Sequence, residues 1–236
     1  MTDAPAIFCA LDRPDLDGAL ALGRSLVGVV GGLKVGLEFV TANGPDGVRQ
    51  IVDLGLPVFL DVKFHDIPNT VGRAVAAAHA LGVAMLTLHV MGGAAMLRAA
   101  VETAHARAPC MKLIGVTVLT SLDDADLAAL GVAEKVTAQV LRLAELAWDA
   151  GLDGLVCAPH ELPLLRNRFD RGFSLVIPGI RPAGSAMGDQ KRTKSPAEAA
   201  AAGADVLVIG RPITEASDPV ASARAINAEI TQALAA

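Results

Sequence analysis

The residues best suited to chemistry lie close together in the segment FLDVKFHDIPNT, which spans residues 59–70. Asp61 and Lys63 are two positions apart in a predicted strand, so their side chains point to the same side. Asp66 follows at the turn into a predicted helix, and we expect it near Lys63. Opposite charge favours the protonated form of a lysine, whereas a lysine that forms an imine must be neutral. The cluster therefore predicts a lysine ammonium that donates a proton to a developing carbanion.

The elements that position these residues are indicated by short apolar, β-branched runs, which recur every few tens of residues. These runs predict strands over 6–11, 32–36, 57–62, 83–89, 111–118, 152–157, 173–178 and 205–210. Ala- and Leu-rich segments with helical spacing lie between them, such as 70–81, 134–150 and 196–202. Strands that alternate with helices imply a parallel sheet with right-handed crossovers. About eight such units close a (β/α)8 barrel.

We therefore predict an α/β protein in which residues 1–236 form a single (β/α)8 TIM barrel, one catalytic domain. An open doubly wound sheet is the alternative, but it usually carries a Gly-rich fingerprint after its first strand. Here the first run is followed by Asp12-Arg13-Pro14-Asp15, and residues 28–36 lack both the G-x-G-x-x-G and the Walker A spacing. No composition shift or linker marks a domain boundary.

Charged residues recur where such a barrel places its chemistry, at the C-terminal ends of the strands and in the following loops. The first run ends in Asp12 and the second carries Lys34, so that together with Asp61 and Lys63 they would alternate in sign. A purely structural ion-pair network that closes the barrel mouth is the alternative. Burying several charges costs more than burying apolar residues unless function retains them, which favours a catalytic cluster.

A predicted anion site follows the seventh and eighth runs, whose loops commonly bind phosphate in this fold. The seventh run ends in Arg181, and the eighth ends in Gly210-Arg211-Pro212. Gly210 lets backbone N–H groups approach an anion, Arg211 supplies a charged fork, and Pro212 suits the start of a short helix whose N-terminus attracts phosphate. The polar segment 183–194 between the two runs is interpreted as a lid, with a solvated loop as the alternative.

Composition excludes several classes of protein. The chain has 25 acidic and 20 basic residues and a net charge of −5, whereas a nucleic-acid binder is normally basic. Cys9, Cys110 and Cys157 are too scattered for a disulfide framework or a thiolate metal site, and no spacing matches a zinc site. Residues 74–97 carry no charge, but they read as a buried helix and strand rather than a membrane span. With no secretory signal visible, we expect a cytoplasmic protein.

The segment DVKFHDIPNT, residues 61–70, closely resembles the D-x-K-x-x-D signature of the orotidine 5′-phosphate decarboxylase family in its long form, D-x-K-x-H-D-I-P-x-T. The resemblance continues over nearly the whole chain, at residues 10–12, 34–36, 116–121, 178–181, 189–190 and 208–211. It implies a homodimer of barrels that converts orotidine 5′-monophosphate to uridine 5′-monophosphate and carbon dioxide, the last step of de novo UMP synthesis. It also implies that neither a cofactor nor a metal takes part.

The resemblance assigns roles at the reacting end of the substrate. It implies that Lys63 donates a proton to C6 of the pyrimidine, that Asp61 lies against the substrate carboxylate, and that Lys34 hydrogen-bonds Asp61 and the ribose. Asp12 would bind ribose hydroxyls. The resemblance implies that Asp66 and Thr70 contact the ribose in the partner's site, and that Thr120 and Ser121 contact the pyrimidine. It implies that the phosphate is held by Arg181, Gln190, Gly210 and Arg211. Gly188 departs from the pattern, because a side chain such as Asn is expected before Asp189-Gln190.

Two other functions are weighed against this one. A sugar-phosphate decarboxylase or aldolase of the same suprafamily, of the 3-keto-gulonate 6-phosphate type, shares the short signature but needs Mg²⁺ and a carboxylate where Lys34 stands. A lysine there would repel the metal. A barrel that only binds a nucleotide is the other alternative, and the intact pair of Asp61 and Lys63 argues against it.

Overall fold

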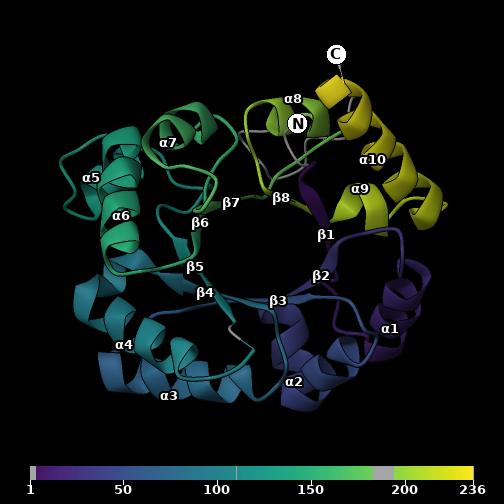
Figure 1. Cartoon of the computed structure of the whole chain (residues 1–236), viewed down its shortest axis with the longest axis horizontal. Coiled ribbons are helices and arrows are strands. Elements are labelled where there is room, and N and C mark those ends of the chain that lie inside the picture. Colours follow the sequence, from purple (N-terminus) through teal and green to yellow (C-terminus); the bar gives the residue numbers. More distant parts are fainter. Residues whose placement is uncertain (1–3, 110, 183–193, 236) are drawn as a thin grey trace.

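The computed structural model describes residues 4–109, 111–182 and 194–235, and within them eight parallel strands close into a barrel in chain order. The helices surround this barrel as an outer ring (Figure 1). The strands are β1 (Ala6–Ala10), β2 (Gly32–Gly36), β3 (Val58–Phe64), β4 (Met85–His89), β5 (Lys112–Val116), β6 (Gly154–Val156), β7 (Ser174–Ile177) and β8 (Val206–Ile209). The predicted fold class is confirmed, and seven of the eight predicted apolar runs contain one of these strands, whereas β3 begins inside its run and extends beyond it.

Helices follow the strands and cover the outside of the barrel. In chain order they are α1 (Leu16–Ser25), α2 (Leu37–Val52), α3 (Pro68–His79), the short 3₁₀ helix η1 (Val90–Gly92), α4 (Gly93–His105), α5 (Asp124–Ala129), α6 (Val136–Asp149), α7 (Leu162–Arg168), α8 (Pro196–Ala201), α9 (Arg211–Thr214) and α10 (Pro219–Ala235). The uncharged stretch 74–97 divides among α3, β4, η1 and α4. None of the helices in the described part of the chain is long and apolar enough to cross a membrane.

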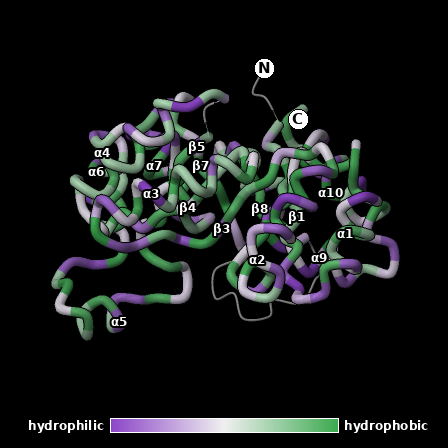
Figure 2. The backbone as a smooth tube through the Cα atoms, turned by 90° about the horizontal axis from the view of Figure 1, so that it is seen from below, coloured by the Kyte–Doolittle hydropathy of each residue, from purple (hydrophilic) through white to green (hydrophobic). Residues whose placement is uncertain are grey.

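Side-chain caps determine where several helices begin. The Asp15 carboxylate accepts a hydrogen bond from Gly18 N at the start of α1, which satisfies a backbone donor that the helix leaves unpaired. Ser195 and Glu198 form a reciprocal capping box on α8, and Asp123 with Asp126 forms another on α5. The connection that carries α5 projects beyond the rest of the molecule in the side view (Figure 2).

The core has two parts, as the near-continuous apolarity of the strands requires. The larger part lies between the barrel and its helices. The smaller part fills the barrel interior and consists of Phe8, Ala10, Phe59, Met85, Ile114, Val176, Val206 and Val208. The rings of Phe8 and Phe59 meet edge to face, with 6.4 Å between their centroids. Phe59 lines a cavity at one mouth of the barrel, and Phe8 lines a cavity of about 600 Å³ at the other.

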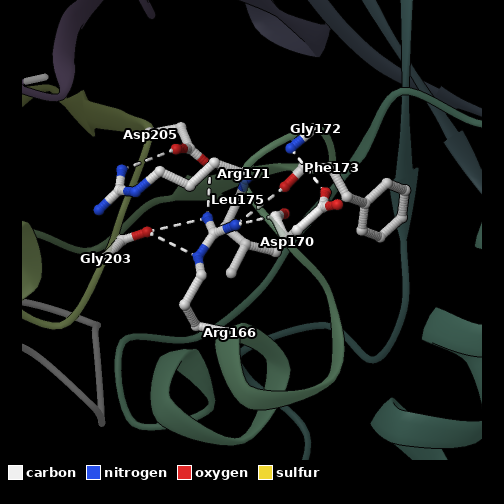
Figure 3. A network of polar contacts seen from close by, with 8 residues as sticks. All are labelled: Arg166, Asp170, Arg171, Gly172, Phe173, Leu175, Gly203 and Asp205. Carbon is white, nitrogen blue, oxygen red and sulfur yellow. Dashed lines mark hydrogen bonds and ion pairs between the residues drawn. The ribbon is translucent and has the colours of Figure 1, made fainter. Parts of the chain in front are cut away.

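An arginine-centred network joins α7 to the N-terminal ends of β7 and β8 (Figure 3). The Arg166 guanidinium donates to the carbonyl oxygens of Asp170 and Gly203, at 2.7 and 2.9 Å, and pairs with the Asp205 carboxylate. Asp205 also accepts a hydrogen bond from Leu175 N at 2.7 Å. Because this end of a barrel generally serves stability rather than chemistry, we interpret the network as structural.

Strand β3 departs from the predicted geometry at its C-terminal end. It continues to Phe64, beyond the expected end at residue 62, and its register against β4 shifts between Leu60 and Phe64. Lys63 adopts a φ of 54°, a left-handed backbone conformation that is uncommon for residues other than glycine. The extra residues form a bulge, which is a feature often found next to active sites.

Candidate active site

A polar cavity of about 530 Å³ opens at the C-terminal ends of the strands, where a barrel places its chemistry. Its floor is apolar and includes Phe59, Val116 and Val176. Its polar lining consists of Asp12, Lys34, Asp61, Lys63, Thr120, Arg181, Gly210, Arg211, Thr214 and Glu215. Most of the residues predicted to form the site therefore meet in one cavity. Thr214 and Glu215 were not predicted, because they follow a strand end by several positions and carry no motif.

The charged side chains form a continuous chain of alternating sign. Lys34 Nζ lies 2.8 Å from Asp12 Oδ1 and 3.7 Å from Asp61 Oδ2, and Lys63 Nζ lies 2.8 Å from Asp61 Oδ1. The side chains of Lys34 and Asp61 are only 8% and 16% exposed, whereas Lys63 is 30% exposed. Each ammonium therefore has a carboxylate beside it, and Lys63 is the ammonium that solvent or a ligand reaches more easily.

The buried hydroxyl of Thr87 forms hydrogen bonds to two residues of this charged cluster. Thr87 Oγ1 donates a hydrogen bond to Asp61 Oδ1 at 3.0 Å and accepts one from Lys63 N at 2.9 Å. Sequence reasoning missed Thr87, since a single Thr in the apolar run MLTLH resembles an ordinary strand residue. The only signal was its spacing of two residues from Met85 and from His89, which places all three side chains on the same face of the strand.

Neighbouring titratable groups are held uncharged by their surroundings. Burial, reinforced by the nearby Asp12 carboxylate, raises the pKa of the Cys9 thiol to about 12, so Cys9 is not a nucleophile near neutral pH. Burial lowers the pKa of His89, and the adjacent His65 and Lys63 lower it further. The two imidazole rings lie 5.4 Å apart between centroids. Neither histidine is among the residues that line the cavity.

The opposite side of the mouth is basic. Arg181 follows β7, and Arg211 begins the four-residue helix α9, with Gly210 as its N-cap and Pro212 in the first turn, as predicted. A side chain at Gly210 would meet Ala10 Cβ at an ordinary distance of 3.5 Å, so the protein itself does not require glycine there. Arg181 Nη1 donates to Ile180 O at 2.9 Å, and Ile180 forms a β-bridge with Lys194.

Some predicted residues lie elsewhere. Asp66 is exposed and accepts a hydrogen bond from Ile67 N at 2.6 Å, and among the described residues Lys63 forms its ion pair with Asp61 rather than with Asp66. Thr70 and Ser121 are also outside the cavity lining, although Thr120 belongs to it. Gln190 and the rest of the predicted lid at 183–193 lie outside the described residues. Among the residues that the structure does describe, no group of three or more His, Cys, Asp or Glu side chains forms a metal site.

A closed parallel barrel with a charged cavity at the C-terminal ends of its strands defines the class of (β/α)8 barrel enzymes. Within that class, the chain belongs to the orotidine 5′-phosphate decarboxylase / HUMPS family, whose model matches residues 5–226.

Individual relatives agree with this membership. The chain is 52% identical over 224 residues to the orotidine 5′-phosphate decarboxylase of Novosphingobium aromaticivorans, covering 95% of this chain and 98% of that protein. It is 51% identical over 229 residues to that of Paramagnetospirillum magneticum, covering 95% and 97%. A solved structure of the Lactobacillus acidophilus orotidine 5′-phosphate decarboxylase superposes with a TM-score of 0.83 at 35% identity, covering 97% of this chain and 99% of that one.

Proposed function

We propose that this protein decarboxylates orotidine 5′-monophosphate to uridine 5′-monophosphate and carbon dioxide, the last step of de novo UMP synthesis. The observation that carries the proposal is the alternating chain of Asp12, Lys34, Asp61 and Lys63, which ends in an accessible ammonium inside the cavity. Such a chain supplies positive charge and a proton where a carbanion develops. The family membership supports the same reaction.

Substrate binding is proposed to start at the basic side of the mouth. Arg181 and Arg211, with backbone N–H groups at Gly210, bind the phosphate, and Gln190 completes this contact. Guanidinium groups match the geometry of a phosphate. The ribose hydroxyls then lie against Asp12 and Lys34, and Thr120 with Ser121 contacts the pyrimidine. Since the phosphate is remote from the bond that breaks, its binding energy can position the reacting carbon.

Bond cleavage is proposed to occur between Asp61 and Lys63. The substrate carboxylate lies beside Asp61, and the bond from C6 to that carboxylate breaks and leaves its electron pair on C6. Carbon dioxide departs, and a proton from the Lys63 ammonium is transferred to C6. Neutral Lys63 then regains a proton from solvent. These charges are already in position before the reaction begins, so they can stabilise the transition state without a further cost for reorganising the site.

A two-fold homodimer and a cytoplasmic location complete the proposal, with the whole chain as one catalytic unit. Asp66 and Thr70 are exposed, outside the cavity of their own barrel, next to Ile67, which is 66% exposed. An exposed apolar side chain beside such residues suits contact with a partner subunit whose site they enter. The thiols of Cys9 and Cys157 are free, as is usual for proteins in a reducing compartment.

A Mg²⁺-dependent sugar-phosphate decarboxylase or aldolase is not favoured. The resemblance places a metal-binding carboxylate at position 34 in those enzymes. In this chain Lys34 places an ammonium there, 2.8 Å from Asp12 and 3.7 Å from Asp61. That ammonium already pairs with both carboxylates and would repel a divalent cation.

The proposed activity is tested with the purified full chain. Absorbance is used to follow the loss of orotidine 5′-monophosphate with and without EDTA, and 3-keto-gulonate 6-phosphate with added Mg²⁺ serves as the competing substrate. We expect turnover of the nucleotide at the same rate in both buffers. Turnover of the sugar phosphate alone, or a rate that EDTA abolishes, contradicts the proposal.

A further inference from the structure

We infer that Thr87 is a positioning residue whose hydroxyl holds Asp61 and Lys63 in their working arrangement. This inference rests on the roles proposed above for those two residues. Thr87 is fully buried and is not among the residues that line the cavity. It therefore acts through its neighbours rather than by touching the substrate.

The backbone pairing explains why a hydroxyl is needed at this place. Leu60 pairs with Leu86, and Phe64 pairs with Leu88, so residues 61–63 of β3 stand opposite Thr87 alone. A bulge of this kind interrupts the ladder of backbone hydrogen bonds. Lys63 N donates instead to Thr87 Oγ1 at 2.9 Å. The hydroxyl thus replaces the strand carbonyl that a regular ladder would offer.

The same hydroxyl also fixes the neighbouring carboxylate. Its hydrogen is donated to Asp61 Oδ1 at 3.0 Å, and that oxygen also accepts from Lys63 Nζ at 2.8 Å. One group therefore links the side chain of Asp61 to the backbone of Lys63. Because Lys63 has a φ of 54°, which is unfavourable for a residue with a side chain, its conformation depends on such external contacts.

Packing alone does not require a hydroxyl at this position. Thr87 pairs with Ile114 on β5. Ile114 and Met85 both belong to the apolar interior of the barrel. Valine has nearly the shape of threonine and would suit this apolar layer. The Thr87→Val substitution consequently removes two hydrogen bonds while keeping most of the packed volume.

The experiment compares the kinetics of Thr87→Val, Thr87→Ser and wild type on orotidine 5′-monophosphate. We expect Thr87→Val to lower kcat about 10- to 100-fold, because small misplacements of reacting groups have effects of that size. KM should stay within about threefold, since the contacts that hold the phosphate are unchanged. Affinity for uridine 5′-monophosphate, measured by calorimetry, should also stay close to wild type. Thr87→Ser keeps the hydroxyl and should restore most of kcat.

Thr117→Val is the matched control. Thr117 lies just beyond β5 and is 1% exposed, and its hydroxyl has no hydrogen-bond partner within the described structure. This variant removes an equally buried hydroxyl that does not contact Asp61 or Lys63, so its kcat should match wild type. If Thr117→Val loses as much as Thr87→Val, or if Thr87→Ser fails as fully as Thr87→Val, the inference is overturned.

Two further comparisons keep the result decisive. If Thr87→Val does not fold, Thr87→Ala and Thr87→Ser differ by the hydroxyl alone, and equal kcat values for that pair overturn the inference. Lys63→Ala separates the inference from the proposal beneath it. An active Lys63→Ala variant refutes the proposed role of Lys63, whereas an inactive Lys63→Ala variant beside a fully active Thr87→Val variant refutes only the role of Thr87.

Discussion

Lys63 is the residue on which the proposed chemistry depends most directly. The Lys63→Ala substitution removes the proton donor and leaves the Asp61 carboxylate without the ammonium that lies 2.8 Å away. We expect kcat to fall by about 1000-fold or more, since a positioned proton donor alone contributes roughly 10²- to 10⁴-fold. Steady-state turnover of the purified variant measures this change. Lys135→Ala removes an exposed lysine at the start of α6 and serves as the control, which should retain wild-type turnover.

Arg211 lines the cavity and is proposed to contact the phosphate at the other end of the substrate, so its loss should appear in a different kinetic constant. A charge-assisted contact to phosphate is lost in Arg211→Ala, and KM for the nucleotide should rise roughly 10- to 100-fold. Turnover of orotidine, which lacks the phosphate, should change much less. Comparing kcat/KM for the two substrates measures the difference. An equal loss for both substrates would assign Arg211 a structural role instead.

Arg166 allows the contribution of one element, helix α7, to the stability of the fold to be tested. Its guanidinium joins that helix to the residues that precede β7 and β8. Arg166→Ala removes this link and leaves the partly buried Asp205 carboxylate with weaker compensation, so the free energy of unfolding should fall by about 3 kcal/mol. The kcat at a temperature where the variant is folded should remain near wild type, because the network lies at the N-terminal ends of the strands, at the opposite mouth of the barrel from the candidate active site.

Arg168 is the matched control for this measurement, because it lies on the same helix. Its ion pair with Glu145 joins two exposed side chains, and such pairs contribute about 0–1 kcal/mol. Denaturant unfolding of Arg168→Ala should therefore stay close to wild type. A similar loss of stability in both variants would show that truncating either arginine of α7 destabilises the protein. The Arg166 network would then contribute no more to the free energy of unfolding than an exposed ion pair does.

The elements also show how far sequence reasoning reaches. Buried parallel strands are continuous apolar runs, so β2 and β8 were predicted almost to the residue. The end of β3 was not, because a bulge depends on how two strands pair rather than on the composition of either one. Asp61 and Lys63 were correctly paired because they lie close together on one strand. Thr87 was missed because it lies on the neighbouring strand, and its contacts depend on how the two strands pair. The contact of Asp66 could not be predicted either, since it depends on the local turn, in which the carboxylate accepts a hydrogen bond from Ile67 N.

The whole molecule is tested by mixing two inactive variants. If Asp66 enters the partner's site, Lys63→Ala and Asp66→Ala are each severely impaired, but a mixed dimer contains one site with both wild-type residues. Random exchange makes half of the dimers mixed, so activity should recover to roughly a quarter of wild type. Turnover measured after subunit exchange gives this fraction. Mixing that restores nothing would place both residues in the site of a single chain.

The edge-to-face pair of Phe8 and Phe59 has a consequence for the origin of the transferred hydrogen. These rings belong to the packed interior that separates the two mouths of the barrel, and packed apolar layers of this kind exclude water. Within the described chain, Lys63 therefore exchanges hydrogen with solvent from the substrate side. Once a nucleotide covers that side, the ammonium is isolated with the hydrogens it already carries. If Lys63 donates the proton as proposed, the hydrogen delivered to C6 should record the isotopic composition of the solvent at the moment of binding, rather than at the moment of bond cleavage.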